Sequence, residues 1–158
     1  MDAIFPELST YNRGMGGYSL KGVLNVGWVD IHAVYPQGTV PSPFLSKLSE
    51  IMQLPTGAPF DPFMETIREL PHCEACGDIR YLRGDEFVRS NSELWIPTAE
   101  LIYASPLIMV HHITDHGYCP PAEYIEAVLA LELDQRFDSY VVYKEKLFES
   151  GWYDLVPT

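Results

Sequence analysis

The chain has 158 residues, 47% of them hydrophobic and 13% aromatic, which is enough apolar material for a single self-standing domain over residues 1–158 and excludes an intrinsically disordered protein. Its 10 Lys and Arg against 22 Asp and Glu give a formal net charge of -12. Because a surface of this sign repels phosphate groups, we expect no nucleic-acid partner and no attachment to an anionic membrane.

The N-terminal half predicts a loop, a strand and two short helices, in that order. Residues 12–17 are rich in glycine and lead into a strand rather than a helix, so they predict a loop that does not bind phosphate. Residues 20–29 alternate in part and are rich in β-branched side chains, which predicts a strand. Ser42 before a proline, and an Asp-Pro pair further on, are capping signals that predict helices over residues 43–53 and 62–70.

The C-terminal half predicts short strands followed by helices. Four strand candidates lie at residues 79–82, 87–88, 94–96 and 101–103. A third helix covers residues 107–116 and stops at Gly117, and Pro120 with Pro121 opens a fourth. Residues 140–148 suit a fifth helix, although the first four of them suit a strand equally. We therefore expect an α+β fold in which four to five helices surround a small antiparallel sheet.

The expected location is a reducing cytoplasm. No stretch approaches the roughly 18 apolar residues of a membrane-spanning helix. Residues 1–7 contain an early acid and no basic residue, unlike a secretory signal peptide. The three cysteines form an odd set, and two of them, Cys73 and Cys76, are too close in sequence for an ordinary structural disulfide.

A metal-binding motif begins at Cys73. Cys73-x2-Cys76 followed by glycine has the form of a zinc knuckle, in which two thiolates share one ion and the glycine turns backbone amides toward sulfur. The chain has only five histidines, and three of them share the predicted third helix: His111, His112 and His116. A cysteine pair, then strands, then a helix with histidines is the order of a zinc finger, here spread over residues 71–118.

Two histidine pairs can complete this site. His112 and His116 are four residues apart and share one helical face. His111 and His116 are five apart, which suits a helix that loosens at its C-terminus. Either pair gives a Cys2His2 set, typical of structural Zn²⁺. A redox cysteine pair is disfavoured, because such pairs begin a helix after a strand; a metal-free core in which these residues only pack stays open.

The same residues disfavour catalysis at the ion. Four protein ligands close the coordination sphere, whereas a catalytic zinc needs an open position. No Glu follows the first histidine as in H-E-x-x-H, and no H-x-E motif of a zinc deaminase lies upstream of the cysteines. The alternative is a zinc-dependent hydrolase that uses the three histidines, with Asp115 or Glu74 as the base.

Other residues are weaker candidates. Asp30 and His32 alternate on one strand and suit a carboxylate–histidine pair, for which a structural role is favoured over a general base. Cys119 is expected to be a buried thiol rather than a substitute ligand. Four aromatic residues could line a binding surface, although core packing is their expected role: Tyr11, Tyr18, Trp28 and Tyr35.

Residues 111–128, which contain His-His-x3-His-Gly-Tyr-Cys-Pro-Pro, resemble a segment of an uncharacterised family of small bacterial proteins. The C-x-x-C motif and the N-terminal Gly-Trp-Val-Asp and Tyr-Pro-Gln-Gly-Thr-Val-Pro runs are similar to that family too, so the resemblance covers about residues 4–130. It implies four metal ligands: Cys73, Cys76, His111 and His116. The family has an aromatic residue where this chain has His112, so the resemblance favours His111. It implies no activity.

The sequence as a whole predicts a zinc-stabilised, non-enzymatic bacterial domain that acts by binding a protein. Structural zinc contributes ~10–16 kcal/mol of apparent binding free energy in finger peptides, which is enough to organise a loop-rich chain. The charge of -12 favours a basic partner through steering and complementarity. An immunity protein that neutralises a toxin fits this profile, and so does a phage or regulatory adaptor.

Overall fold

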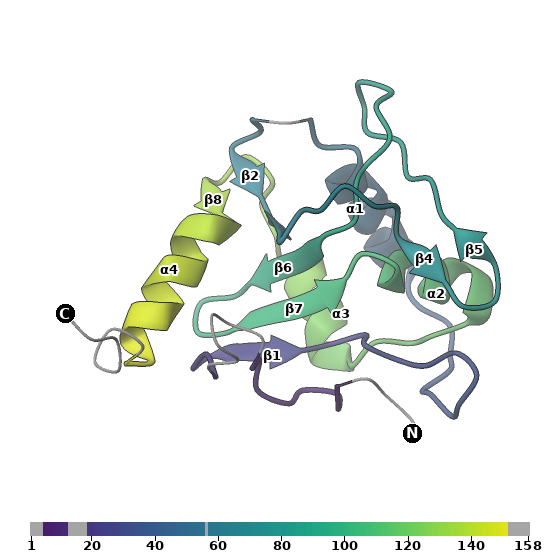
Figure 1. Cartoon of the computed structure of the whole chain (residues 1–158), viewed down its shortest axis with the longest axis horizontal. Coiled ribbons are helices and arrows are strands. Elements are labelled where there is room, and N and C mark those ends of the chain that lie inside the picture. The colour runs from purple at the N-terminus through teal and green to yellow at the C-terminus, as the bar shows by residue number, and fades with distance from the viewer. Residues whose placement is uncertain (1–4, 13–18, 56, 152–158) are drawn as a thin grey trace.

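A four-stranded sheet lies at the centre of the fold (Figure 1). Its order is β1-β7-β6-β3, in which β1 (Val23–Asn25) runs parallel to β7 (Ile102–Pro106), while β6 (Glu93–Pro97) is antiparallel to both β7 and β3 (Phe63–Met64). The sheet is therefore mixed, and the prediction of an antiparallel sheet is wrong at the β1 edge. Hydrophobic alternation predicts a strand but not its direction, and the long connection between β1 and β7 permits the parallel pairing.

The computed structural model describes residues 5–12, 19–55 and 57–151. The glycine-rich loop predicted at residues 12–17 lies outside these ranges except for Asn12, and so does Tyr18. Within them, no helix is both long enough and apolar enough to cross a membrane.

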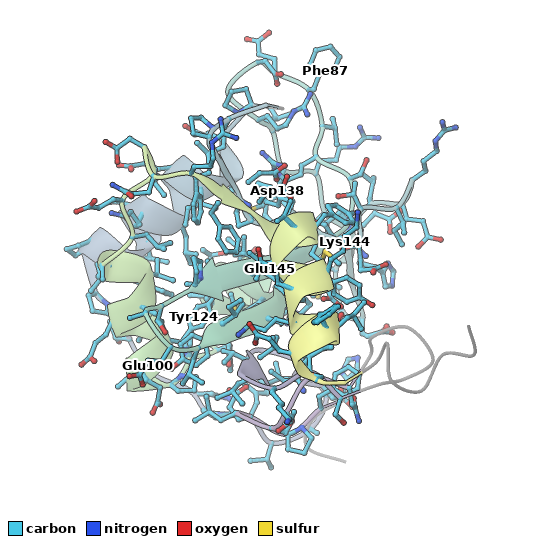
Figure 2. All side chains as sticks on the ribbon, turned by 90° about the vertical axis from the view of Figure 1, so that its left-hand side faces the viewer. Phe87, Glu100, Tyr124, Asp138, Lys144 and Glu145 are labelled. Carbon is cyan, nitrogen blue, oxygen red and sulfur yellow. The ribbon has the colours of Figure 1, made fainter. Side chains whose placement is uncertain are left out.

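Helices cover both faces of the sheet (Figures 1 and 2). α1 (Ser42–Met52) and α3 (Ala122–Leu129) pack against each other on one face, and α4 (Ser139–Glu149) packs near β3 on the other. In Figure 2, α4 stands in front of the sheet with Asp138 at its upper end. Because both faces are covered, four of the five residues of β6 are buried in succession instead of alternating with exposed ones.

The side chains of β6 alternate between two hydrophobic clusters. Leu94 and Ile96 belong to the larger cluster, together with Phe44 of α1 and Tyr124 of α3. Trp95, which is fully buried, belongs to the cluster on the α4 side. Successive side chains of a strand point to opposite faces of the sheet, so β6 contributes to the hydrophobic core on each face.

Three predicted helices form at the expected places. α1 confirms the helix at residues 43–53, but it begins at Ser42 with Pro41 as its N-cap, so Ser42 does not cap it. α3 confirms the helix opened by the proline pair. α4 confirms the helix at residues 140–148: the carboxylate of Asp138 accepts hydrogen bonds from two backbone N–H groups of the first turn, which favours a helix over a strand.

The helix predicted at residues 107–116 is shorter than expected. α2 (Met109–His116) begins two residues later, because Ser105 and Pro106 complete β7 instead of capping a helix. It ends as predicted at Gly117, whose φ of 68° lies in the left-handed region.

The helix predicted at residues 62–70 is wrong. β2 (Phe60–Asp61) and β3 stand at its start, so the described chain has four helices, the lower end of the four to five expected. β3 pairs with β6 at the edge of the central sheet, and β2 pairs in parallel with β8 (Phe137–Asp138). Pairing with strands distant in sequence overrides the local helical spacing.

The strand predictions succeed only in the centre of the sheet. β6 and β7 confirm the strands at 94–96 and 101–103, and only three residues of the strand predicted at 20–29 form β1. The candidates at 79–82 and 87–88 make one isolated bridge, in a loop whose tip carries the exposed Phe87 (Figure 2).

Candidate metal centre

A hairpin of two-residue strands carries the cysteine pair. β4 (His72–Cys73) and β5 (Gly77–Asp78) pair in antiparallel orientation, and the intervening turn holds Cys76. Gly77 has a φ of 85°, a conformation that favours glycine, and it closes the turn. The thiol of Cys73 is buried and that of Cys76 is exposed. Figure 1 shows this hairpin beside α2.

The last turn of α2 supplies the histidines, and it is wider than an ordinary helical turn. The N–H of Gly117 donates to the carbonyl of His112 five residues back, and the N–H of Tyr118 donates to the same carbonyl. Widening of this kind moves residues five apart toward the same side of the helix. The rings of His111 and His116 accordingly meet edge to face, with centroids 5.0 Å apart.

These two elements bring four metal-binding side chains together. One ligand atom from each of four residues lies within 4.8 Å of the other three: Cys73, Cys76, His111 and His116. The Nε2 atom of His116 is 3.4 Å from the Sγ of Cys73 and 3.5 Å from the Sγ of Cys76. The group is close enough to hold a metal ion.

The separate zinc-finger-like unit predicted over residues 71–118 is not confirmed. β6 and β7, which lie between the cysteines and the histidines in sequence, belong to the central sheet. The cysteine hairpin and α2 are therefore held near each other by the main core as well as by their own contact.

His111 has the surroundings of a metal ligand. Its side chain is buried, and among the described residues its Nε2 has no hydrogen-bond partner. Its Nδ1 lies 3.4 Å from a carboxylate oxygen of Asp115, the kind of outer contact that orients a ligating imidazole. Burial lowers the pKa of His111, His116 lowers it further, and Asp115 opposes them. The neutral ring, which is the form that binds a metal, is thereby favoured.

His112 lies outside the group of four, although its spacing to His116 is the one expected for a regular helix. Its ring centroid is 5.9 Å from that of His116. Burial lowers the pKa of His112 to about 4, and the neighbouring His111 and His116 add to the effect. The structure therefore brings together the histidine pair that the family resemblance favours, and it places His112 in the wall of a pocket.

A comparison with known families covers the region just described. A family model described as a domain of unknown function, DUF7919, matches residues 3–129. The chain belongs to this family. No curated protein and no solved structure matches the chain. Membership in DUF7919 agrees with the resemblance to an uncharacterised family, and it assigns no activity.

The DUF7919 match contains the whole candidate centre. The four clustered residues all lie within it, and it ends at Leu129, the last residue of α3. Helix α4 and strand β8 follow the matched region. The metal centre is therefore part of the DUF7919 region, whereas the helix that covers the second face of the sheet lies beyond it.

A pocket of about 480 Å³ adjoins the centre in this DUF7919 domain. His72 and Glu74 of the cysteine hairpin line it, as does His112. Asp30 and His32 line it too, but the carboxylate of Asp30 accepts a hydrogen bond from the backbone N–H of His32 at 2.8 Å, so the predicted side-chain pair is replaced by a side chain–backbone contact.

Two further expectations can be compared with the structure. Cys119, expected to be a buried thiol, is partly buried; its Sγ lies 3.6 Å from the carbonyl oxygen of Pro120 and outside the group of four. Of the aromatic set, Tyr11 is in the core, whereas Trp28 lines the pocket while its indole N–H donates to Ala104. Sequence reasoning missed the contact of Asp115 with His111, for which the four-residue spacing was the available signal.

Proposed function

We propose that this chain is a zinc-stabilised, non-enzymatic domain that acts by binding a protein partner. The observation that carries the proposal is the distance between the imidazole of His116 and the two thiols, 3.4 and 3.5 Å. A tetrahedral zinc ion with Zn–S bonds of about 2.3 Å and Zn–N bonds of about 2.05 Å separates sulfur from nitrogen by about 3.5 Å. The imidazole thus stands at the separation from each thiol that a shared ion requires.

The donor set supports zinc over other ions. Two thiols and two imidazoles suit Zn²⁺, whereas Mg²⁺ and Ca²⁺ prefer oxygen ligands. Two thiolates this close together repel each other, and a cation between them offsets that repulsion. The unpartnered Nε2 of buried His111 supports the same conclusion, because an ion would satisfy it.

A structural role fits this set better than catalysis. Four protein ligands fill a tetrahedral ion and leave no position for water or substrate. A hydrolase that used all three histidines would need His112 as a ligand of the ion, and the group within ligand distance in the described chain contains His111 and His116 instead. In the proposed role the ion fastens the β4–β5 hairpin to α2.

Binding of a protein partner is the function that we assign to the stabilised domain. The net charge of -12 favours a basic partner. A reducing bacterial cytoplasm would keep both thiols available for the ion. An immunity protein or a regulatory adaptor is a role of this kind.

Elemental mass spectrometry of protein purified without added metal tests the proposal. We expect about one zinc ion per chain in the wild type, as for other four-ligand sites. Cys73→Ser should lose the ion, whereas Cys119→Ser, which removes a thiol outside the group, should keep it. Wild-type protein that is folded and free of zinc would contradict the proposal, and so would equal zinc content in both variants.

A further inference from the structure

Two pockets adjoin each other next to the candidate metal centre. The first, of about 480 Å³, reaches from the cysteine hairpin to Trp28. The second, of about 320 Å³, continues toward the start of β6. Both are lined by the same three residues, Trp28, Asn91 and Pro106, so they share a wall. We refer to the two pockets together as the acidic trough.

The charge of the acidic trough has one sign. Four carboxylates line it: Asp30 and Glu74 in the first pocket, Glu65 and Glu93 in the second. None of the described residues that line either pocket is Lys or Arg. An organic cation is therefore the ligand that this trough complements, and the net charge of -12 would steer it there.

Each pocket also contains a buried polar side chain with an unused atom. His112 lines the first pocket and is 6% exposed, and its Nδ1 has no hydrogen-bond partner in the described chain. Ser92 lines the second and is 7% exposed, and its Oγ has no partner there either. Buried polar atoms without partners are rare in folded proteins, and a bound group or an ordered water can complete their hydrogen bonding.

The walls between these groups are apolar. Ile31, Ile108 and Pro106 line the first pocket beside the indole of Trp28. Such walls suit the methylene stem of a long cationic side chain, while the carboxylates suit its charged end. A guanidinium or ammonium group next to Trp28 can also gain a cation–π contact.

We propose that the acidic trough binds two neighbouring Lys or Arg side chains of a basic peptide segment in the protein partner. Two compartments that meet at one wall suit two side chains that project from one backbone. The proposal rests on the proposed function, because it identifies where the domain binds its protein and because the cysteine hairpin supplies His72 and Glu74 to the first pocket.

Calorimetric titration of the zinc-loaded full chain with a blocked tetra-arginine peptide tests this proposal. Spermine, as a small polyamine, and a tetra-glutamate peptide serve as comparison probes. We expect the tetra-arginine peptide to bind, the tetra-glutamate peptide not to bind, and spermine to bind more weakly than tetra-arginine.

Matched variants locate the site. The double variant Asp30→Asn, Glu74→Gln should raise the dissociation constant for tetra-arginine at least about tenfold, the change expected for the loss of one charge-assisted hydrogen bond. Glu145→Gln removes one exposed carboxylate of α4 (Figure 2), none of whose described residues lines either pocket, and should leave binding unchanged. Tighter binding of spermine, or equal loss in both variants, would overturn the proposal.

Zinc content, measured on the same samples, separates this proposal from the previous one. Zinc-loaded wild type that binds none of the probes would overturn the peptide site and leave the metal centre standing. Zinc-free wild type that binds tetra-arginine through Asp30 and Glu74 would support the peptide site and overturn the metal centre.

Discussion

His116 places its Nε2 3.4 Å from the Sγ of Cys73, although 43 residues separate them in sequence. One belongs to a hairpin of two-residue strands and the other to the widened end of α2. A hairpin this small is not stable by itself in water. The contact between the two residues therefore locates the point where the hairpin is fastened to the rest of the fold.

The choice between neighbouring histidines can be tested by substitution. We expect His111→Gln and His116→Gln each to remove the zinc ion, because each removes one of four ligands. His112→Gln should keep the ion, since His112 lies outside the group within ligand distance. Metal content by elemental mass spectrometry after gel filtration gives the measurement. If His112→Gln loses zinc and His111→Gln keeps it, the ligand is His112, four residues before His116, and our assignment of His111 is wrong.

Removal of the metal should loosen the hairpin before it unfolds the core. Treatment with a strong chelator is expected to increase amide hydrogen exchange at residues 72–78 while the amides of β6 and β7, which pair across five residues, stay protected. The melting temperature should also fall, by about 2–4 °C for each kcal/mol that the ion contributes to the folded state.

Mass spectrometry with peptide-level hydrogen exchange measures the first effect, and calorimetry the second. Untreated protein and chelated protein reloaded with Zn²⁺ are the controls, and reloading should restore both values. Uniform loss of protection throughout the sheet would instead mean that the ion holds the whole fold together.

Two helix ends are predicted correctly from local signals, whereas the partners of the strands are not. The proline pair before α3 and Gly117 after α2 are local signals, and the structure confirms both. The direction of β1 and the pairing of Phe63 with Leu94 depend on contacts distant in sequence, and local spacing does not contain them.

The candidate centre was predictable for a similar reason. The cysteine motif is local, so Cys73 and Cys76 can be identified from their spacing. The choice of His111 depends on hydrogen bonds from Gly117 and Tyr118 to one carbonyl, which widen the last turn of α2. The pocket beside the centre combines four regions of the chain, at residues 27–32, 72–74, 91 and 106–112, and no spacing rule predicts it.

Arg89 should be a major contributor to stability outside the metal centre. Its guanidinium donates hydrogen bonds to the carbonyls of Met52 and Leu54 at the end of α1, and it lies 3.8 Å from the ring centroid of Phe63. Burial lowers its pKa to about 10, with Arg83 adding to the effect, so the group stays charged at neutral pH. We expect Arg89→Ala to lower the free energy of unfolding by about 3 kcal/mol, since it removes a cation–π contact and leaves carbonyls unpaired.

Urea denaturation followed by circular dichroism measures this loss. Arg136→Ala is the matched control, because Arg136 is exposed and the same charge is removed. The control should change the unfolding free energy by less than about 0.5 kcal/mol. Similar losses in the two variants would mean that the charge itself, rather than the contacts of Arg89, is responsible.

Gly27 allows the close approach of α2 to the segment after β1, and a methyl group there should be costly. Its φ is +83°, and a Cβ at this position would lie 2.5 Å from the Sδ of Met109. Gly57 has a similar φ of +86°, but among the described residues, its chain neighbours aside, no atom lies within 4 Å of such a Cβ. Gly57→Ala should therefore report backbone strain alone, about 1 kcal/mol, whereas Gly27→Ala should lose about 2–4 kcal/mol because overpacking is added.

Denaturant unfolding of both variants, together with the double variant Gly27→Ala, Met109→Ala, separates the two effects. Met109→Ala removes the side-chain atoms nearest to a Cβ at position 27. In that background, Gly27→Ala should therefore lower the free energy of unfolding by an amount closer to that of Gly57→Ala. If Gly27→Ala lowers the free energy of unfolding equally in the wild type and in Met109→Ala, the clash with Met109 is not the cause. The backbone conformation of Gly27 then accounts by itself for the need for glycine.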